Sequence, residues 1–394
     1  MTVVSRHYVL AAGGTGGHLI PAFALASELE RRGHHVALIT DERGTAIPGK
    51  PASLTAHVLP AGRLQGLNPL SWIGGLRAIW QGRAMALRLF ESFEPSAVVG
   101  FGGYPAFPAL LAATRAGLPT VIHEQNAVLG RVNRRLAGRV DAIATAFAKV
   151  DRLADKHSDK ATLVGNPVRT EVLALRDKPF PTFTQDSPFR ILVTGGSQGA
   201  RVLSEVVPDG LAMLPLALRS RLQVTQQCRP EDIEAVRKRY ADHGIPAELA
   251  TYFEDMANRL ADAHLFIGRA GASTIAELTA VGRPAILIPL PIATDDHQAA
   301  NVREVVAAGG ARAVRQEKFT AAELAKQIQA MALHPETLGN AAHAAWNCGY
   351  PKAASDLADL VESFGASPLM DVIRVGSGEA RASGAEALAK DSAP

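Results

Sequence analysis

Short apolar runs alternate along the first half of the chain with longer stretches in which apolar residues recur at helical spacing. The runs cover residues 8–12, 35–40, 97–100, 120–123, 142–145 and 161–164. Apolar runs of this length predict buried strands, and the stretches between them predict helices. Such alternation is typical of parallel βαβ units with helices on both faces of one sheet.

The second half of the chain repeats this pattern. A run that begins at Arg190 is followed by runs at residues 222–226, 247–252, 265–268, 285–288 and 311–314. A stretch rich in proline, threonine and serine near residues 179–188 predicts an exposed connection between the halves. The pattern therefore predicts an α/β protein with two Rossmann-like, doubly wound parallel-sheet domains whose strand ends face a shared cleft.

The C-terminal part differs from both halves. Helical spacing over residues 341–364 predicts a final helix that packs across the two domains. Residues 376–394 are rich in glycine, alanine, serine and charge, which is typical of disorder. We expect domains at 1–165 and 166–340, a helix at 341–365 that crosses back toward the first domain, and a disordered tail at 366–394.

Each half opens with a glycine-rich turn between a strand and a helix. In the first half the turn runs from Gly13 to Gly17 and is followed by His18, and in the second it runs from Gly195 to Ala200. Glycine lets backbone N–H groups approach an anion, and the positive end of the following helix dipole favours negative charge there. Both turns are therefore candidate phosphate-binding loops.

Composition narrows the class of protein. The chain has 394 residues, enough for two cores, and a net charge of only +3, which gives no general field for nucleic acid. Two cysteines, Cys228 and Cys348, cannot form a disulfide framework and fit a reducing compartment. No apolar stretch is long enough to span a bilayer, so we expect a cytoplasmic protein.

Three chemistries could use these loops. Nicotinamide binding is suggested by Asp41 after the second strand, but the third glycine of that fingerprint would fall at Leu19. Ester hydrolysis is suggested by Ser197 between Gly195 and Gly199, with Asp295 and His297 downstream, but it leaves the first domain without a role. Transfer of a sugar from a nucleotide diphosphate uses both halves.

Six motifs stand in an order that identifies a resemblance. They span Gly13–His18, Gly102–Tyr104, His123–Asn126, Gly165–Arg169, Gly195–Ala200 and Arg269–Glu277. In this order they resemble the MurG family of UDP-N-acetylglucosamine transferases. The resemblance implies a GT-B fold. It also implies an inverting transfer of GlcNAc from UDP-GlcNAc to the 4-hydroxyl of MurNAc in undecaprenyl-diphospho-MurNAc-pentapeptide (lipid I), which gives lipid II in peptidoglycan synthesis.

The resemblance also implies catalytic residues. His18 is the candidate base for the acceptor hydroxyl, although a histidine at this position could instead cap the helix or orient a phosphate. Glu124 is the rival: its carboxylate could take the proton, or it could hold His18 or the acceptor. Tyr104 and Glu124 are the candidate acceptor-binding residues.

Most of the implied donor-binding residues lie in the second half. Glu277 would accept hydrogen bonds from the ribose hydroxyls, although an acid there could instead stabilise a helix dipole. The main chain of Phe253 would read the uracil, and Gln298 would bind the sugar. The full set is Thr15, Gly16, Gly17, Asn126, Arg169, Ser197, Phe253, Ala272, Ser273, Thr274, Ile275, Ala276, Glu277 and Gln298.

We expect no metal and no cofactor, because many GT-B enzymes use helix dipoles instead. Asp295, Asp296 and His297 are adjacent on a turning backbone, and such neighbours rarely converge on one ion. A nucleotide-dependent oxidoreductase and a UDP-GlcNAc sensor without turnover remain the alternatives.

A lipid-linked acceptor calls for a membrane contact. Residues 68–93 carry apolar side chains at helical spacing with arginines nearby, which suits binding to an anionic membrane, although core packing would give the same spacing. The candidate contacts are Trp72, Ile73, Leu76, Ile79 and Trp80. We expect a peripheral protein on the cytoplasmic side of the bacterial inner membrane, with other cell-wall synthesis proteins as candidate partners and no nucleic acid.

Overall fold

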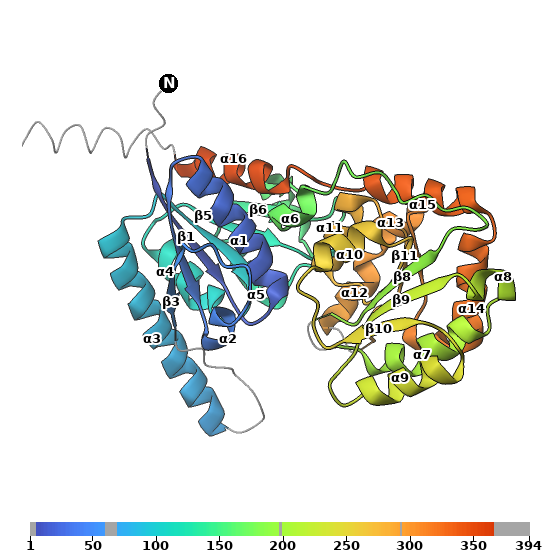
Figure 1. The fold of residues 1–394 in the computed structure, drawn as a ribbon. Coiled ribbons are helices and arrows are strands. Elements are labelled where there is room, and N and C mark those ends of the chain that lie inside the picture. Colours follow the sequence, from blue (N-terminus) through green and yellow to red (C-terminus); the bar gives the residue numbers. More distant parts are fainter. Residues whose placement is uncertain (1–4, 60–68, 197–198, 292–293, 366–394) are drawn as a thin grey trace, which may run out of the picture.

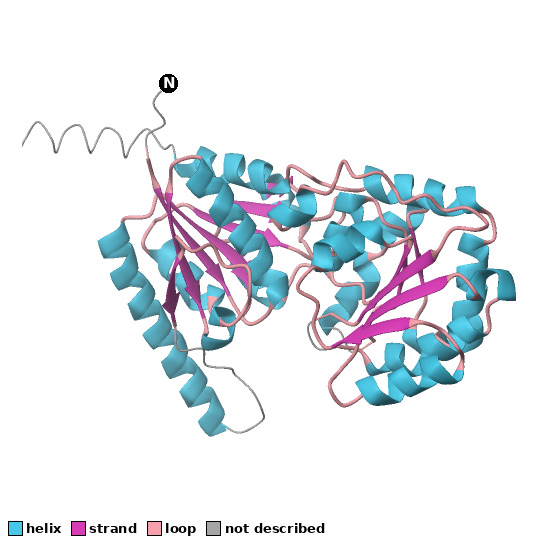
Figure 2. Cartoon of the chain, in the orientation of Figure 1, coloured by secondary structure: helices cyan, strands magenta, loops and turns pink. Residues whose placement is uncertain are grey.

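The computed structural model describes residues 5–59, 69–196, 199–291 and 294–365. They form two lobes, each built on one parallel sheet with helices on both faces (Figures 1 and 2). The predicted α/β class with two doubly wound domains is confirmed.

The first lobe holds a sheet of seven strands in the order β3-β2-β1-β4-β5-β6-β7. The strands are β1 (His7–Ala12), β2 (His35–Thr40), β3 (Thr55–Val58), β4 (Ala97–Gly102), β5 (Thr120–Glu124), β6 (Ala142–Thr145) and β7 (Ala161–Leu163). Between these strands lie the helices α1 (Gly16–Arg31), α2 (Glu42–Thr45), α3 (Pro69–Phe93), α4 (Ala106–Arg115) and α5 (Arg131–Leu136). A 3₁₀ turn, η1, covers Asp155–Lys160.

Alternate residues of β1 enter different cores. Tyr8 and Leu10 pack with α1 and the last described helix, whereas Val9 and Ala11 pack with α3 and α4. A strand that is buried on both faces needs apolar residues at every position, which is why it reads as a continuous apolar run.

The second lobe holds a sheet of six strands in the order β10-β9-β8-β11-β12-β13. The strands are β8 (Phe189–Thr194), β9 (Leu222–Gln227), β10 (Ala247–Ala250), β11 (Leu265–Gly268), β12 (Ala285–Leu287) and β13 (Ala311–Ala313). Ile191 and Val193 face one core and Leu192 faces the other. The helical segments are α6 (Thr170–Leu173), α7 (Arg201–Ala212), α8 (Leu216–Arg219), α9 (Ile233–Asp242), α10 (Met256–Asp262), α11 (Ala272–Val281), η2 (Thr294–Asp296), α12 (His297–Asn301), α13 (Arg303–Ala307), η3 (Gln316–Lys318) and α14 (Ala321–Ala332).

The predicted single helix at 341–364 is wrong, because the structure has two helices there. They are α15 (Pro335–Asn347) and α16 (Ala353–Gly365). Pro351 has no N–H to continue a helix, and a side chain at Gly349 would come 2.6 Å from the Thr279 carbonyl oxygen. The chain therefore turns between them and places α15 on the second lobe and α16 on the first (Figure 1).

Helix α16 is attached to the first lobe by charged and apolar contacts. The Arg32 guanidinium lies 2.6 Å from Asp359 and 2.7 Å from Glu362, and His34 Nε2 lies 2.8 Å from Glu362. Leu357 and Val361 enter the core beside β1 and α1. The last described helix thus packs against β1 and α1 of the first lobe.

Two strands differ from the expectation. Strand β3 was not predicted, because it lies at an edge of the sheet and its residues are partly or fully exposed, which leaves no apolar run. The run at 247–252 ends as a strand at Ala250, because β10 is an edge strand whose ladder with β9 ends there. The predicted tail at 366–394 lies outside the described residues.

Candidate functional site

The first glycine turn is held by a second turn and by an acid. A side chain at Gly103 would come 2.5 Å from the Gly13 carbonyl oxygen, so the turns after β1 and β4 touch through their backbones. Asp41 Oδ1 accepts hydrogen bonds from the Gly14 N–H at 3.1 Å and the Gly44 N–H at 2.9 Å. The acid that suggested a nicotinamide site therefore shapes the glycine turn instead.

Asp41 is held in its charged form. Burial opposes the charge, but hydrogen bonds from Arg43, Gly14 and Gly44 outweigh burial and lower the pKa of Asp41. The remaining residues of the turn, Thr15, Gly16 and Gly17, are exposed or half-buried at the start of α1. Their positions leave them accessible to a ligand.

His18 lies in the first turn of α1 and contacts the end of β5. Its Nδ1 is 3.1 Å from Gln125 Oε1, and its ring borders the backbone of Gly102 at the end of β4. Gln125 Nε2 lies 3.0 Å from His123 Nδ1, and His123 Nε2 lies 2.9 Å from the Gly165 carbonyl oxygen. A chain of hydrogen bonds thus joins His18 to Gly165, which lies in the linker between the lobes, here the residues 164–169 between β7 and α6.

The Glu124 carboxylate is already occupied by the protein. Its Oε1 accepts from the Asn126 N–H at 3.0 Å and side-chain amide at 3.3 Å. Its Oε2 accepts from the Gly130 N–H at 2.7 Å and the Asn133 amide at 2.8 Å. Glu124 is buried, and its hydrogen bonds to Asn126 and Gly130 hold the loop after β5 in its conformation. Tyr104, the other candidate acceptor residue, is half-buried in the turn after β4.

Asn301, which the sequence analysis did not single out, joins the lobes beside Asn126. It is fully buried, and its Oδ1 accepts from the Ala127 N–H at 2.8 Å. Its Nδ2 donates to Asn126 Oδ1 and to the Ala270 carbonyl oxygen, both at 3.2 Å. One side chain from α12 thus fixes the loop after β5 against the loop after β11.

Arg169 and Glu277 are brought together. Arg169 Nε lies 2.8 Å from Glu277 Oε1, and Nη2 lies 3.1 Å from Oε2. Burial alone would lower the pKa of Arg169, but the neighbouring Glu277 charge outweighs it and raises that pKa. Glu277 lies in α11 and Arg169 immediately before α6, so the pair joins the segment that connects the lobes to a helix of the second lobe.

The remaining candidate donor-binding residues lie at the start of α11 and in the loops near it. The hydroxyl of Ser273 is buried and has no hydrogen-bond partner among the described residues. Thr274 is half-buried nearby, and Gln298 Oε1 accepts from the Ala270 and Leu290 N–H groups at 3.3 and 3.0 Å. Phe253 is buried beneath the Arg259 guanidinium, which lies 4.3 Å from its ring centre. Ser197 lies outside the described residues.

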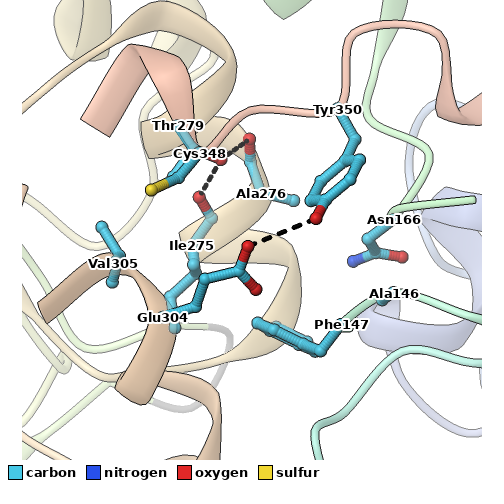
Figure 3. A pocket seen from close by; sticks show the side chains of 11 residues that line it. Ala146, Phe147, Asn166, Ile275, Ala276, Thr279, Glu304, Val305, Cys348 and Tyr350 are labelled. Atoms are coloured by element: carbon cyan, nitrogen blue, oxygen red, sulfur yellow. Dashed lines mark hydrogen bonds between the residues drawn. The ribbon is translucent and has the colours of Figure 1, made fainter. Parts of the chain in front are cut away.

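The opposite face of α11 borders a small cavity between the lobes (Figure 3). The cavity measures about 30 Å³, which is room for a water molecule, and Ala272, Ile275 and Ala276 line it. Asn166 is buried there, and neither atom of its amide has a partner among the described residues. Tyr350 donates to Glu304 at 3.2 Å, and burial followed by the Glu304 charge raises the pKa of Tyr350 to about 12.

Asp295 binds arginines of the first lobe. Its two oxygens lie 2.8 Å from Arg134 Nη2 and 2.8 Å from Arg152 Nη1. Asp295 and Asp296 both adopt positive φ, 60° and 53°, so the backbone turns sharply between them. Within the ranges that the structure describes, no cluster of His, Cys, Asp and Glu side chains is arranged to hold a metal ion.

Helix α3 carries the candidate membrane contacts. Trp80 is 64% exposed, with Arg83 stacked 5.5 Å from its ring centre, and Ile79 is half-buried. The side chains of Trp72, Ile73 and Leu76 lie outside the described residues. Among the helices that the structure describes, none has the length and apolar character to cross a bilayer.

Comparisons with known proteins agree with this architecture. Residues 8–145 match the Glycosyltransferase family 28 N-terminal domain, and residues 190–362 match the Glycosyltransferase family 28 C-terminal domain. The chain is 79% identical over 389 residues to the UDP-N-acetylglucosamine--N-acetylmuramyl-(pentapeptide) pyrophosphoryl-undecaprenol N-acetylglucosamine transferase of Novosphingobium aromaticivorans, covering 99% of this chain and 100% of that protein.

Two further matches extend the comparison. The protein of the same name from Zymomonas mobilis is 63% identical and covers 92% of this chain and 93% of its own length. The crystal structure of Acinetobacter baumannii MurG superposes with a TM-score of 0.72 at 30% identity, covering 91% of this chain and 99% of that one. The predicted resemblance and the GT-B fold are confirmed.

Proposed function

Because this chain belongs to glycosyltransferase family 28, we infer that it transfers N-acetylglucosamine from UDP-N-acetylglucosamine to the N-acetylmuramyl-pentapeptide of undecaprenyl diphosphate, forming lipid II. The observation that carries this conclusion is the 79% identity to a transferase of that name across 99% of the chain. The site is consistent with it, because α1, which carries His18 in its first turn, contacts α11, which carries Glu277, across the two lobes.

The proposed reaction is a single inverting displacement. The 4-hydroxyl oxygen of MurNAc forms a bond to C1 of GlcNAc while its proton passes to a base. The bond from C1 to the β-phosphate oxygen breaks, and UDP leaves with the electron pair. We propose that backbone N–H groups at the N-terminus of α11 and at the first glycine turn stabilise the diphosphate charge.

Among the two candidate bases, the contacts favour His18. The Glu124 carboxylate accepts four hydrogen bonds from N–H groups of its own loop, so taking a proton would break at least one of them. His18 uses Nδ1 toward Gln125, which leaves Nε2 for the acceptor hydroxyl. We assign His18 as the catalytic base and Glu124 as the residue that shapes the loop after β5, with Tyr104 as the other candidate acceptor residue.

The two lobes are proposed to divide the substrates. Residues 1–165 hold the acceptor and face the membrane, and residues 166–340 hold the donor. The donor set is the one that the resemblance implied, with Glu277 on the ribose hydroxyls, Gln298 on the sugar and Ser197 on the phosphates. Asn126 reaches the sugar from the first lobe, where Asn301 orients its amide.

We place the protein at the cytoplasmic face of the inner membrane as a peripheral protein, because its acceptor is lipid-linked. The exposed Trp80 and the arginines of α3 support this placement. Other cell-wall synthesis proteins remain candidate partners.

The test is transfer of labelled GlcNAc from UDP-GlcNAc to a short-chain lipid I analogue, with and without a metal chelator. We expect product at the same rate in both reactions. Asp295 is paired with arginines, and in the proposed site backbone N–H groups stabilise the negative charge of the diphosphate. Product that requires added metal would contradict the metal-free site. Binding of UDP-GlcNAc without any product would favour a sensor, and absence of binding would contradict the assignment as a whole.

A further inference from the structure

Three polar side chains and one carbonyl oxygen form a line from the base to the interdomain linker. The line runs from His18 through Gln125 and His123 to Gly165, with successive separations of 3.1, 3.0 and 2.9 Å. Gln125 and His123 are buried, and His18 alone reaches the open side of the site. Because each contact has a donor and an acceptor, the line determines where the hydrogens lie.

The inner end of the line fixes the state of His123. Complete burial disfavours the charged ring and lowers the pKa of His123 to about 4, so the ring is neutral near pH 7 and carries one N–H. The Gly165 carbonyl oxygen can only accept a hydrogen bond, so the hydrogen is on Nε2. Nδ1 of His123 is therefore an acceptor.

The amide of Gln125 has one orientation that satisfies its neighbours. Its Nε2 faces His123 Nδ1 at 3.0 Å and the His123 carbonyl oxygen at 3.1 Å, and both of these atoms accept. A flipped amide would place its oxygen against these two acceptors. The Gln125 oxygen is consequently the atom that faces His18.

We propose that Gln125 is a positioning residue that holds His18 in the tautomer with hydrogen on Nδ1, so that the lone pair on Nε2 takes the acceptor proton. An amide oxygen accepts and cannot donate, so the His18 nitrogen that faces it must carry hydrogen. When Nε2 gains the hydroxyl proton, the Nδ1–H remains bound to the same oxygen, and no side chain has to move. The source of that proton rests on the proposed function, whereas the tautomer rests on the contacts alone.

A positioning role for Gln125 predicts a different effect on the reaction than a purely structural role would. Without its oxygen the ring of His18 can adopt either tautomer, and the form with hydrogen on Nε2 cannot accept a proton from the substrate. The backbone N–H groups and the donor-binding lobe remain in place in that case. Loss of Gln125 should therefore lower kcat while the affinity for UDP-GlcNAc stays the same.

The test is Gln125→Met, which has a similar length and no hydrogen-bonding amide. Gln329→Met, the same substitution on α14 of the second lobe, is the control. We expect Gln125→Met to lower kcat about ten- to a hundred-fold, within the range that acid–base catalysis supplies. Gln329→Met should match the unmodified protein.

The direct readout is ¹⁵N NMR of histidine-labelled protein, with the His18 signals identified by their absence in His18→Gln. In the unmodified protein the hydrogen should lie on Nδ1, and in Gln125→Met the Nε2–H form should appear. Hydrogen on Nε2 in the unmodified protein would overturn the proposal. So would Gln125→Met with kcat within about twofold of the unmodified protein, or with lowered kcat and an unchanged tautomer. If the unmodified protein transfers no GlcNAc, the proposed function fails while the tautomer measurement still stands.

Discussion

The guanidinium of Arg169 lies across the carboxylate of Glu277, with Nε 2.8 Å from Oε1 and Nη2 3.1 Å from Oε2. A carboxylate has about four acceptor sites, so the pair leaves about two of them free. The two hydroxyls of a ribose would fill the same number of sites. Arg169 can thus orient and charge-balance the carboxylate while Glu277 binds the nucleoside.

Glu277→Ala should weaken UDP-GlcNAc binding. Hydrogen bonds to a charged group contribute about 1.5–3 kcal/mol each, so losing one or two raises Kd at least about tenfold. Calorimetric titration measures this change. The control is Glu171→Ala, which removes an exposed carboxylate 3.8 Å from the same Arg169 and should leave Kd unchanged. An unchanged Kd in Glu277→Ala would mean that Glu277 pairs with Arg169 and does not bind the nucleotide.

His18→Ala and Glu124→Gln should fail in different ways. Removing the base should lower kcat by about 10²- to 10⁴-fold with donor affinity kept, because no other group takes the proton. Glu124→Gln places an NH₂ group against N–H donors of its loop, so it should lower stability by about 1–3 kcal/mol.

Pre-steady-state turnover and thermal unfolding separate these two variants. Glu124→Gln should keep residual turnover well above that of His18→Ala, since His18 is still present. A Glu124→Gln protein of full stability whose kcat falls as far as that of His18→Ala would transfer the role of base to Glu124.

Asn301→Ala should loosen the two lobes. The substitution leaves the Ala127 N–H without its acceptor and removes the contacts to Asn126 and the Ala270 carbonyl. A buried unsatisfied group costs about 1–3 kcal/mol, so the melting temperature should fall by several degrees. Small-angle scattering should also show a broader distribution of lobe separations. Asn347→Ala, at an exposed position on α15, is the control, and equal effects of both changes would refute a specific link.

The fold could be predicted because its signal is local. Strands buried on both faces need apolar residues throughout, so β1, β4 and β11 stand out as continuous runs. Strand β3 could not be found, since an exposed edge strand imposes no such pattern. Gly349 and Pro351 mark the break between α15 and α16. The break was missed because apolar residues recur at helical spacing on both sides of it.

The site could be predicted only in part, because its contacts join distant segments. The family resemblance, carried by the glycine turns and the motifs around them, pointed to His18, Glu124 and Glu277 as candidates. Which side chains face each other depends on the packing of both sheets. The roles of Asn301 and Gln125 therefore gave no separate signal in the sequence. Asp41 suggested a nicotinamide site, whereas in the structure its carboxylate accepts a hydrogen bond from the Gly14 N–H.

Trp80→Ala should weaken attachment to membranes. The side chain is 64% exposed on α3, and burying it in the interface of a bilayer would remove its apolar surface from water. Losing that burial should lower the partition coefficient on phosphatidylglycerol vesicles about tenfold, as measured by sedimentation. Leu216→Ala, an exposed apolar residue on α8 of the second lobe, should leave binding unchanged. If both variants bind as the unmodified protein does, α3 is an ordinary packed helix.

Stability should fall as the pH drops from about 6.5 toward 4, and His123 should account for part of the fall. The folded ring has a pKa of about 4 because it is buried, whereas the unfolded ring has its ordinary value of 6.5. Between these values the unfolded chain binds a proton that the folded chain does not, which favours unfolding by about 1.4 kcal/mol per pH unit. His123→Gln, whose amide can still donate to Gly165 and does not titrate, should show a shallower fall in urea unfolding over this pH range. A slope identical to that of the unmodified protein would mean that the buried ring takes up its proton without unfolding.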